Sequence, residues 1–433
     1  MDLIKNLFKG DKVIWIVFLF LCLISIIEVF SASSTLTYKT GDYWRPITMH
    51  IILLMVGVIV VLIMHNIPCK WFKTFVVLLP ISWALLISVL LIGALTNGAK
   101  RWIDLGFIQF QPSELAKMGT IIGVAFILSK CQEEDGANKK AFKYILWITG
   151  GTCGLIFTEN LSTAVLLAVS VFMMMFIGRV PYKQLGKLML IGVASIASFF
   201  IVIQSVPSEA WEKIGLHRMV TWKNRFSDHF NPGEIPAAKF DINNDAQVAH
   251  ANIAIATSHI IGKGPGNSVQ RDFLSQAFSD FIYAIIIEEL GLIGGAGVAI
   301  LYIVLLMRIG KIARNCDKSY YVFLIMGIGI LLVTQAMFNM LVAVGIMPVT
   351  GQPLPLISKG GTSTLINCAY IGIILSVSQY VNKLKEQQAE KEDEAIKRQA
   401  EIQTAAIELI QTAGNRLKGS EVSLPKDNKS EKE

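Results

Sequence analysis

Long apolar runs alternate with short polar stretches along this chain, and the alternation sets its architecture. The runs reach roughly 18 to 25 residues, the length that a helix needs to cross a hydrocarbon core about 30 Å thick. The pattern therefore predicts an all-α, polytopic membrane protein with about ten transmembrane helices. The expected spans are Val13–Phe30, Pro46–Met64, Phe72–Leu95, Ser113–Ser129, Phe142–Phe157, Leu161–Ile177, Leu188–Ser205, Phe281–Met307, Tyr321–Gly345 and Ser363–Val381.

Composition agrees with a membrane protein. Hydrophobic residues make up 53% of the chain and charged residues only 16%. The mean hydropathy is +0.55, far from that of a soluble globular domain. Membrane lipid is the expected surrounding, and no nucleic-acid partner is expected.

Lysine and arginine concentrate in every second connecting segment, and basic short loops stay in the cytosol. This predicts cytosolic ends, residues 1–12 and 382–433, on either side of a ten-helix membrane domain at 13–381. One large extracytoplasmic loop, 206–279, then faces outward, together with Asn97–Pro112 and Ile346–Thr362. The large loop could meet an anionic ligand such as a lipid pyrophosphate through its basic residues His217, Arg218, Lys223, Arg225, Lys263 and Arg271.

Several classes of site are disfavoured. The six cysteines contain no CxxC pair, which argues against disulfides and metal. The histidines show no HExxH spacing, and neither a Walker A loop nor a Rossmann fingerprint occurs. The tail carries opposite charges at helical spacing, such as Glu394 and Arg398, which predicts a cytosolic helix. We expect most of it to be solvated, with a partner site as the alternative.

Asp280 stands at the threshold of the span that begins at Phe281. A carboxylate at the edge of hydrocarbon is costly unless it pairs, stays hydrated or reacts, so Asp280 is the first functional candidate. Glu288 and Glu289 lie two turns or more deeper in the same span. A neighbouring helix could pair with one of them, and structural or coupling roles are expected there.

The first outward loop brings cations and an aromatic ring together. Lys100, Arg101 and Trp102 could bind a phosphate and a sugar face, or could anchor the loop at the membrane interface. Just beyond, Glu114 and Lys117 lie one turn apart near the start of a span. They could contact substrate, or form a structural ion pair that fixes the helix.

Two further loops have unusual backbones. Gly262–Ser268 is rich in glycine, so its N–H groups could approach an anion, with Lys263, Asn267 and Ser268 as candidate ligands. A plain turn is the alternative. Pro348–Ser363 mixes three prolines with small residues at membrane depth, which is tolerated only against protein or a cavity. We expect a rigid wall there, with Pro348 and Gly351 as structural residues and Lys359 as a further cation.

These segments together resemble the SEDS family of bacterial membrane proteins, which includes FtsW, RodA and SpoVE, and look most like the FtsW branch. The resemblance rests on Gly98-Ala99-Lys100-Arg101-Trp102, Gln111-Pro112-Ser113-Glu114-Leu115-Ala116-Lys117, Gly264-Pro265-Gly266-Asn267-Ser268-Val269-Gln270, Asp280-Phe281-Ile282-Tyr283-Ala284, Glu288-Glu289-Leu290-Gly291, and Pro348-Val349-Thr350-Gly351.

The resemblance implies a ten-helix SEDS fold and a peptidoglycan glycosyltransferase activity. Such an enzyme polymerises lipid II into glycan strands and releases undecaprenyl pyrophosphate. A class B penicillin-binding protein (a transpeptidase) and other division proteins are implied as partners, and the division septum as the setting. One departure is Glu159-Asn160-Leu161-Ser162, where the family has Pro-Asp-Leu-Gly. The aspartate of the key motif, Asp280, is kept.

The expected reaction needs a base, because a sugar hydroxyl is a poor nucleophile; a positioned carboxylate contributes about 10²–10⁴-fold. Asp280 is the candidate base. Arg101, Lys117, Lys263 and Lys359 are candidate cations for the leaving pyrophosphate. A divalent cation such as Mg could share that role, although the sequence offers no dedicated ligand set. A lipid II flippase, with broken helices and internal repeats, and a non-catalytic division scaffold are the rival classes.

Overall fold

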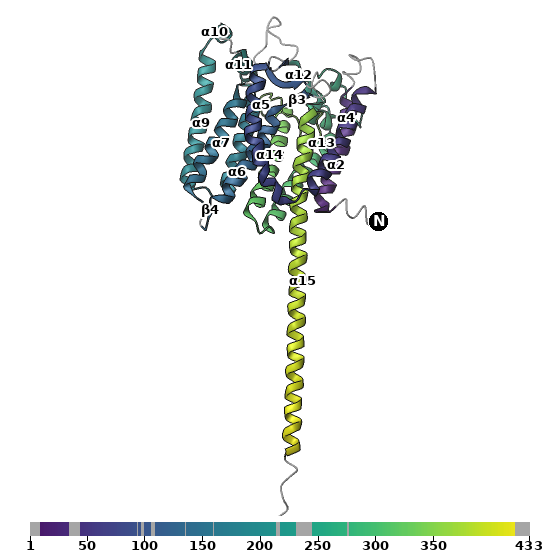
Figure 1. Ribbon diagram of the computed structural model, residues 1–433. Helices are drawn as coiled ribbons and strands as arrows, with labels where there is room; N and C mark the ends of the chain where they lie inside the picture. The colour runs from purple at the N-terminus through teal and green to yellow at the C-terminus, as the bar shows by residue number, and fades with distance from the viewer. Residues whose placement is uncertain are drawn as a thin grey trace, which may run out of the picture. The chain divides into compact units, whose positions relative to one another are not determined.

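The computed structural model describes residues 9–33, 44–92, 94–96, 99–104, 109–134, 136–158, 160–213, 217–230, 245–274 and 277–420. Glu159 lies outside the described residues. Each of the ten expected spans coincides with a helix (Figure 1). These are α2 (Lys12–Ala32), α4 (Arg45–Asn66), α5 (Leu78–Ile92), α6 (Pro112–Lys130), α7 (Lys139–Phe157), α8 (Leu161–Ile177), α9 (Tyr182–Ser205), α13 (Ile282–Arg314), α14 (Ser319–Ala343) and α15 (Gly361–Ser420).

Within the described residues, seven helices are long and apolar enough to cross a membrane, and α8 is a shorter apolar helix. The helices α6 and α7, which begin with charged or basic turns, are not among the seven. The 3-10 helix η1 (Cys69–Val77) leads directly into α5. The molecule is thus an all-α, multi-pass membrane protein.

The chain divides into two compact units, Met1–Gln379 and Tyr380–Glu433, and the boundary falls inside α15. The second unit is helical to Ser420, and its side chains are exposed from Lys385 to Gln411. The first unit contains the membrane helices and all of the residues discussed below.

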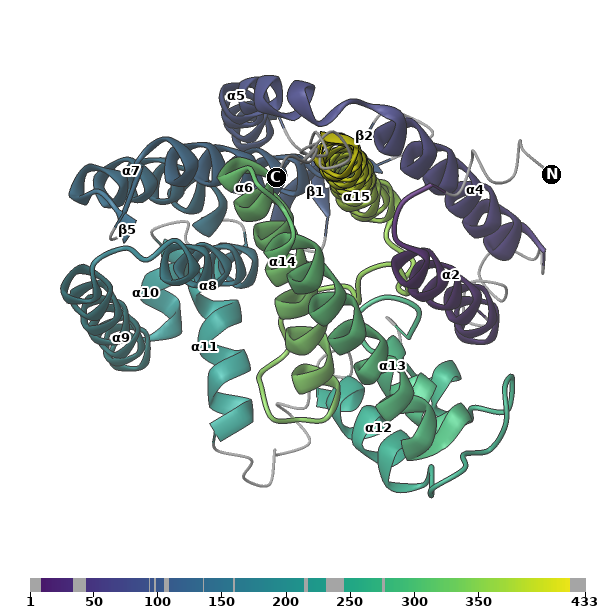
Figure 2. The same ribbon diagram turned by 90° about the horizontal axis from the view of Figure 1, so that it is seen from below.

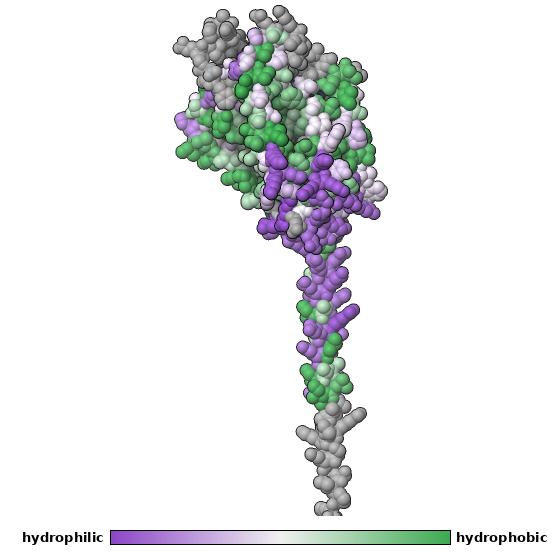
Figure 3. Space-filling model, turned by 90° about the vertical axis from the view of Figure 1, so that its left-hand side faces the viewer, coloured by the Kyte–Doolittle hydropathy of each residue, from purple (hydrophilic) through white to green (hydrophobic). Residues whose placement is uncertain are grey.

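Helix α14 forms the centre of the membrane unit (Figure 2). It packs against α13, α6 and α8, while α13 also packs against α2, and α6 against α5 and α7. Of the 18-residue apolar stretch in each helix, 72% is buried in α14 but only 6% in α9. Many exposed side chains of α9, such as Leu190 and Ile201, are apolar, which suits contact with lipid. Figure 3 shows hydrophobic side chains (green) over much of one flank, and hydrophilic ones (purple) at the lower end of the unit.

Short elements gather at the upper end of the unit in Figure 1. They include β1 (Ala94–Thr96), β2 (Ala99–Asp104) and β3 (Gln109–Phe110), which pair antiparallel in that order. The third span was expected to reach Leu95, but the helix ends at Ile92 because the next residues pair as strands. Three helices, α10 (Ser208–Lys213), α11 (His217–Phe230) and α12 (Asp245–Ala256), belong to the large loop, as does the 3-10 helix η2 (Gln270–Asp272). The other pair, β4 (Gln132–Glu133) and β5 (Gly136–Ala137), joins α6 to α7.

Helix α13 is broken at Gly291, whose φ of 74° and ψ of −176° are not helical. The loop before η2 fills the break. Gly291 approaches it so closely that a Cβ there would lie 2.2 Å from the carbonyl oxygen of Ile260. The loop also supplies hydrogen bonds to the interrupted helix: Leu292 N to His259 O at 3.3 Å, and Gly264 N to Glu289 O at 2.8 Å. Backbone groups at membrane depth need such partners.

Candidate active site at the start of helix α13

Asp280 lies just before α13, where the chain enters the membrane unit. Its Oδ1 accepts a hydrogen bond of 3.0 Å from the hydroxyl of Ser279. Its backbone carbonyl accepts one of 2.8 Å from Nδ2 of Asn339, on α14. The residue as a whole is half-buried. The central helix of the bundle thus fixes the backbone at Asp280, while the side chain stays at the end of the bundle.

The segment Pro348–Gly360, here named the wall loop, packs beside Asp280 without forming a helix or a strand apart from a turn. Asn339 Nδ2 also donates to Gln352 O at 2.8 Å, and Ser358 Oγ donates to Ser279 O at 2.6 Å. Gly351 has a φ of 67°, and a Cβ there would lie 3.5 Å from Asp280 Oδ2. The glycine therefore leaves one face of the carboxylate uncovered, and Pro348 begins the rigid wall that the sequence suggests.

Two arginines from different loops interact electrostatically with the Asp280 carboxyl. Burial raises the pKa of the Asp280 carboxyl, and this effect outweighs the lowering by the Ser279 hydroxyl, Arg225 and Arg101. Arg101 lies on β2 and Arg225 on α11. The carboxyl therefore has a pKa above its usual range, although two cations are near it.

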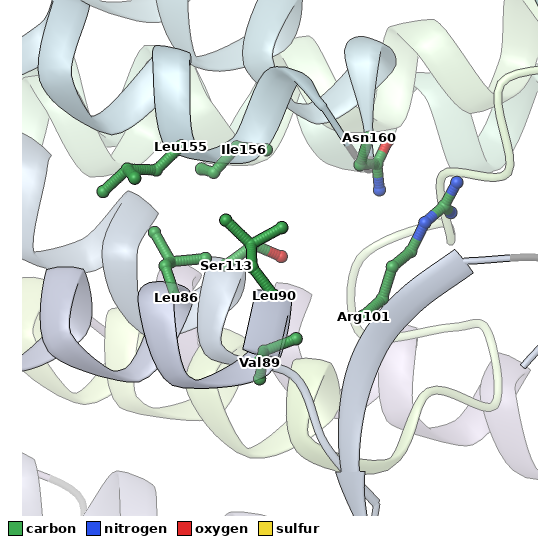
Figure 4. Close-up of a pocket in the computed structure, with 8 residues that line it drawn as sticks. All are labelled: Leu86, Val89, Leu90, Arg101, Ser113, Leu155, Ile156 and Asn160. Atoms are coloured by element: carbon green, nitrogen blue, oxygen red, sulfur yellow. The ribbon is translucent and has the colours of Figure 1, made fainter. Parts of the chain in front are cut away.

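A pocket opens beside Arg101 (Figure 4). It has about 300 Å³ of empty volume, part of it open to solvent. Arg101 and Asn160 lie at one end, and the other end is apolar. The lining residues are Leu86, Val89, Leu90, Arg101, Ser113, Leu155, Ile156 and Asn160. The pocket could hold a molecule that joins an anionic group to a hydrocarbon chain.

Glu114 and Lys117 form a buried ion pair of 2.8 Å, with side chains 3% and 1% exposed. Lys117 Nζ also donates to Gln335 Oε1 at 3.0 Å. Gln335 Nε2 in turn donates to Pro353 O in the wall loop, at 3.0 Å. Of the two roles that the sequence left open, this geometry favours the structural ion pair. Through Gln335, the pair supports the wall loop at Pro353.

The glycine-rich loop binds carboxylates of its own chain. Lys263 Nζ lies 2.5 Å from Glu288 Oε1, and the hydroxyl of Ser268 donates to the same carboxylate. Gly266 N and Ser268 N donate to Glu289, at 2.8 and 3.1 Å. The N–H groups that could have bound a phosphate therefore hold Glu288 and Glu289, which are fully buried.

The other predicted ligands lie in two places. Asn267 Nδ2 donates to Lys263 O at 3.0 Å and so closes the glycine-rich turn. Lys359 N donates to Phe278 O at 3.0 Å, and its ammonium lies 5.6 Å from the Phe278 ring centroid. Trp102 is half-buried next to Arg101 on β2. The structure thus brings Arg101 towards Asp280 and holds Lys359 against Phe278, while Lys117 and Lys263 are each paired with a glutamate.

Within the described residues, no group of three or more His, Cys, Asp or Glu side chains could hold a metal ion. Asp280 would be the carboxylate ligand available to a cation that also binds phosphate.

A family model described as "Cell cycle protein", which covers FtsW, RodA and SpoVE, matches residues 11–383. The chain belongs to this family. A relative from Coxiella burnetii, named "Probable peptidoglycan glycosyltransferase FtsW", is 31% identical over 375 residues, covering 84% of this chain and 95% of the relative. Stage V sporulation protein E of Bacillus subtilis is 29% identical over 376 residues, covering 86% and 97%.

Solved structures share the fold of this FtsW/RodA/SpoVE family member. A chain from a peptidoglycan synthase complex, studied for its coordination of polymerisation and crosslinking, aligns with a TM-score of 0.65 at 24% identity, over 86% of this chain and 99% of that chain. The rod shape determining protein RodA of Thermus thermophilus aligns with a TM-score of 0.59 at 22% identity, over 86% and 98%. The SEDS fold expected from the motifs is confirmed.

Three residues of the site in this family member were not singled out from the sequence: Arg225, Gln335 and Asn339. Arg225 was only one of several basic residues in the large loop. The two amides did leave a signal, because they interrupt an apolar run four residues apart and so share one helix face. Polar residues in a membrane span face the bundle interior and carry function or structure.

Proposed function

We propose that the protein is a peptidoglycan glycosyltransferase that polymerises lipid II and releases undecaprenyl pyrophosphate. The proposal rests on Asp280, a half-buried residue whose carboxylate stands beside Arg101 and Arg225 next to a partly apolar pocket. The name of the Coxiella burnetii relative supports the same reaction.

In this reaction the acceptor hydroxyl attacks the anomeric carbon of the donor sugar. The bond from that carbon to the phosphate oxygen breaks, and its electron pair leaves with the pyrophosphate. Asp280 accepts the hydroxyl proton, and a pKa raised by burial makes its carboxylate a stronger base. Arg101 would stabilise the charge that develops on the leaving group.

The pocket beside Arg101 suits the donor lipid. Its polar end could hold the pyrophosphate and its apolar walls the first isoprene units, since ligand pockets combine apolar linings with a few polar groups. The pocket is small, so most of the undecaprenyl chain would lie in the membrane.

A flippase is the main rival, and the break in α13 bears on it. Broken helices in transporters place half-helix ends and unwound backbone at a substrate site near the midplane. Here Gly262–Gln270 occupies the break and binds Glu288 and Glu289. Because the chain fills its own break, the geometry supports an enzyme. A division scaffold would need no reactive Asp280.

The proposed reaction also implies a cellular location and partner proteins. The multi-pass fold and the family support the cytoplasmic membrane, with both termini in the cytosol and Asp280 at the outer face, during septal wall synthesis and cell division. A class B penicillin-binding protein would crosslink the strands, and the solved synthase complex of similar fold agrees with such a partner. A divalent cation such as Mg could bind the pyrophosphate, but no step requires it.

The decisive experiment measures lipid II polymerisation by purified protein, with and without the partner transpeptidase. Asp280→Asn keeps the size of the side chain and removes its basicity, so polymerisation should fall by about 10²-fold or more. Asp317→Asn, in the turn between α13 and α14, is the control and should keep wild-type activity. Polymerisation by Asp280→Asn at the wild-type rate would rule out the base, and normal growth of cells with this variant would support a scaffold.

A further inference from the structure

Arg225 reaches the wall loop from the large loop. Its Nη1 donates a hydrogen bond of 2.9 Å to the carbonyl oxygen of Val349. Two residues further on, Gly351 borders Asp280 Oδ2. Arg225 and Asp280 therefore meet the same short stretch of the wall loop, although 55 residues separate them in the sequence (280 − 225).

The guanidinium group of Arg225 is not fully used by the protein. Its Nε–H is buried and has no hydrogen-bond partner among the described residues. An arginine carries five N–H donors in a planar fork that matches phosphate oxygens. A buried donor without a partner is unfavourable, so this N–H is suited to an acceptor that arrives with a ligand.

Helix α11 holds Arg225 in place. Trp222, one turn earlier, packs edge-on against Phe157 of α7, with ring centroids 5.4 Å apart, and against Phe199 of α9 at 5.7 Å. Lys223 caps the end of α9 by donating to Val206 O at 2.8 Å and Gln204 O at 3.4 Å. Trp222 and Lys223 thus anchor α11, and Arg225 extends from this helix to the wall loop.

We propose that Arg225 is a phosphate-binding residue of the active site, which together with Arg101 holds the pyrophosphate of a prenyl-linked sugar donor beside Asp280. This inference rests on the proposed function. The two arginines come from α11 and β2, so the donor would be held by both loops that flank the carboxylate. Charge-assisted hydrogen bonds from an arginine fork are strong and geometrically selective for phosphate.

The electrostatics agree with this arrangement. Burial lowers the pKa of Arg225, and the charge of Asp280 opposes that shift. A pyrophosphate would replace part of the hydration that the buried guanidinium has lost. Lys117 and Lys263, the cations suggested by sequence, cannot serve in the same way while they pair with Glu114 and Glu288.

The test is a binding measurement on full-length protein in detergent, with two probes that differ only in charge. Undecaprenyl pyrophosphate carries the anionic group, and undecaprenol lacks it. Arg225→Gln should weaken pyrophosphate binding by roughly tenfold or more and leave undecaprenol binding unchanged. Arg225→Lys should fall between wild type and Arg225→Gln, because it keeps the charge without the fork.

Asn224→Ala, at an exposed position of the same helix, is the matched control, and both probes should bind to it as to wild type. Equal pyrophosphate binding by wild type and Arg225→Gln would overturn the proposal. So would a parallel loss of both probes, since that pattern indicates a structural role. Asp280→Asn should still bind the pyrophosphate. If Asp280→Asn polymerises lipid II normally while Arg225→Gln loses the pyrophosphate, the base assignment fails and the phosphate site stands.

Discussion

The side-chain amide of Asn339 donates a hydrogen bond of 2.8 Å to the backbone carbonyl of Asp280, 59 residues earlier in the chain. The same Nδ2 donates to Gln352 O. One buried amide on the central helix therefore holds both the candidate base and the wall loop beside it. This relationship makes the position of Asp280 depend on α14.

Replacing Asn339 should disturb catalysis without removing any group that reacts. Asn339→Leu leaves two carbonyls without their donor, and we expect polymerisation to fall by roughly tenfold or more, since small misplacements of a base are costly. The loss should appear in kcat rather than KM. Asn66→Leu, whose amide binds Leu62 O on an exposed turn of α4, is the control. Unchanged kcat in Asn339→Leu would show that the amide does not position Asp280.

Activity should depend on pH through Asp280. The base works only when ionised, so the rate should fall as the pH drops through its pKa, and burial sets that pKa above the usual range for aspartate. Arg225 lowers this pKa. Arg225→Gln should therefore move the acid limb of the pH–rate profile to higher pH. A limb that stays in place, measured at saturating lipid II, would contradict the electrostatic link between the two residues.

Variants of the buried pair Glu114 and Lys117 can distinguish a structural role of the pair from substrate binding. Removing one partner, as in Lys117→Met, leaves an uncompensated buried charge, and breaking such pairs typically costs about 3–5 kcal/mol. Thermal unfolding in detergent should show this loss. The double variant Glu114→Gln, Lys117→Met should recover much of the stability and part of the polymerisation. A double variant that is stable and completely inactive would instead indicate contact with substrate.

The break in α13 depends on glycine at position 291. A left-handed φ and a Cβ 2.2 Å from the Ile260 carbonyl oxygen make Gly291→Ala strongly strained. We expect Gly291→Ala to lower the free energy of unfolding by about 1–3 kcal/mol or more. Gly297→Ala in the same helix, where a Cβ meets nothing within 4 Å, should be neutral or slightly stabilising. Equal melting temperatures for the two variants would show that the loop can move away.

Much of the site was predictable because its residues interrupt simple patterns. Asp280 stood out against an apolar run, and Glu114 with Lys117 showed helical spacing that the structure realises as an ion pair. The glycine-rich loop was also conspicuous, but its pattern could not reveal its ligand. Glu288 and Glu289 lie about twenty residues further along, and only folding brings their carboxylates to those N–H groups.

The length and spacing of the apolar runs were enough to determine that this chain crosses a membrane as helices, because hydrocarbon admits few backbone structures. Local motifs determined the family. Tertiary structure alone decided which cations face Asp280. Lys117 and Lys263 are neutralised by glutamates, while Arg225 approaches from a distant loop helix. Charged residues can be read directly from the sequence, but the partner of each charge depends on contacts between residues far apart in the chain.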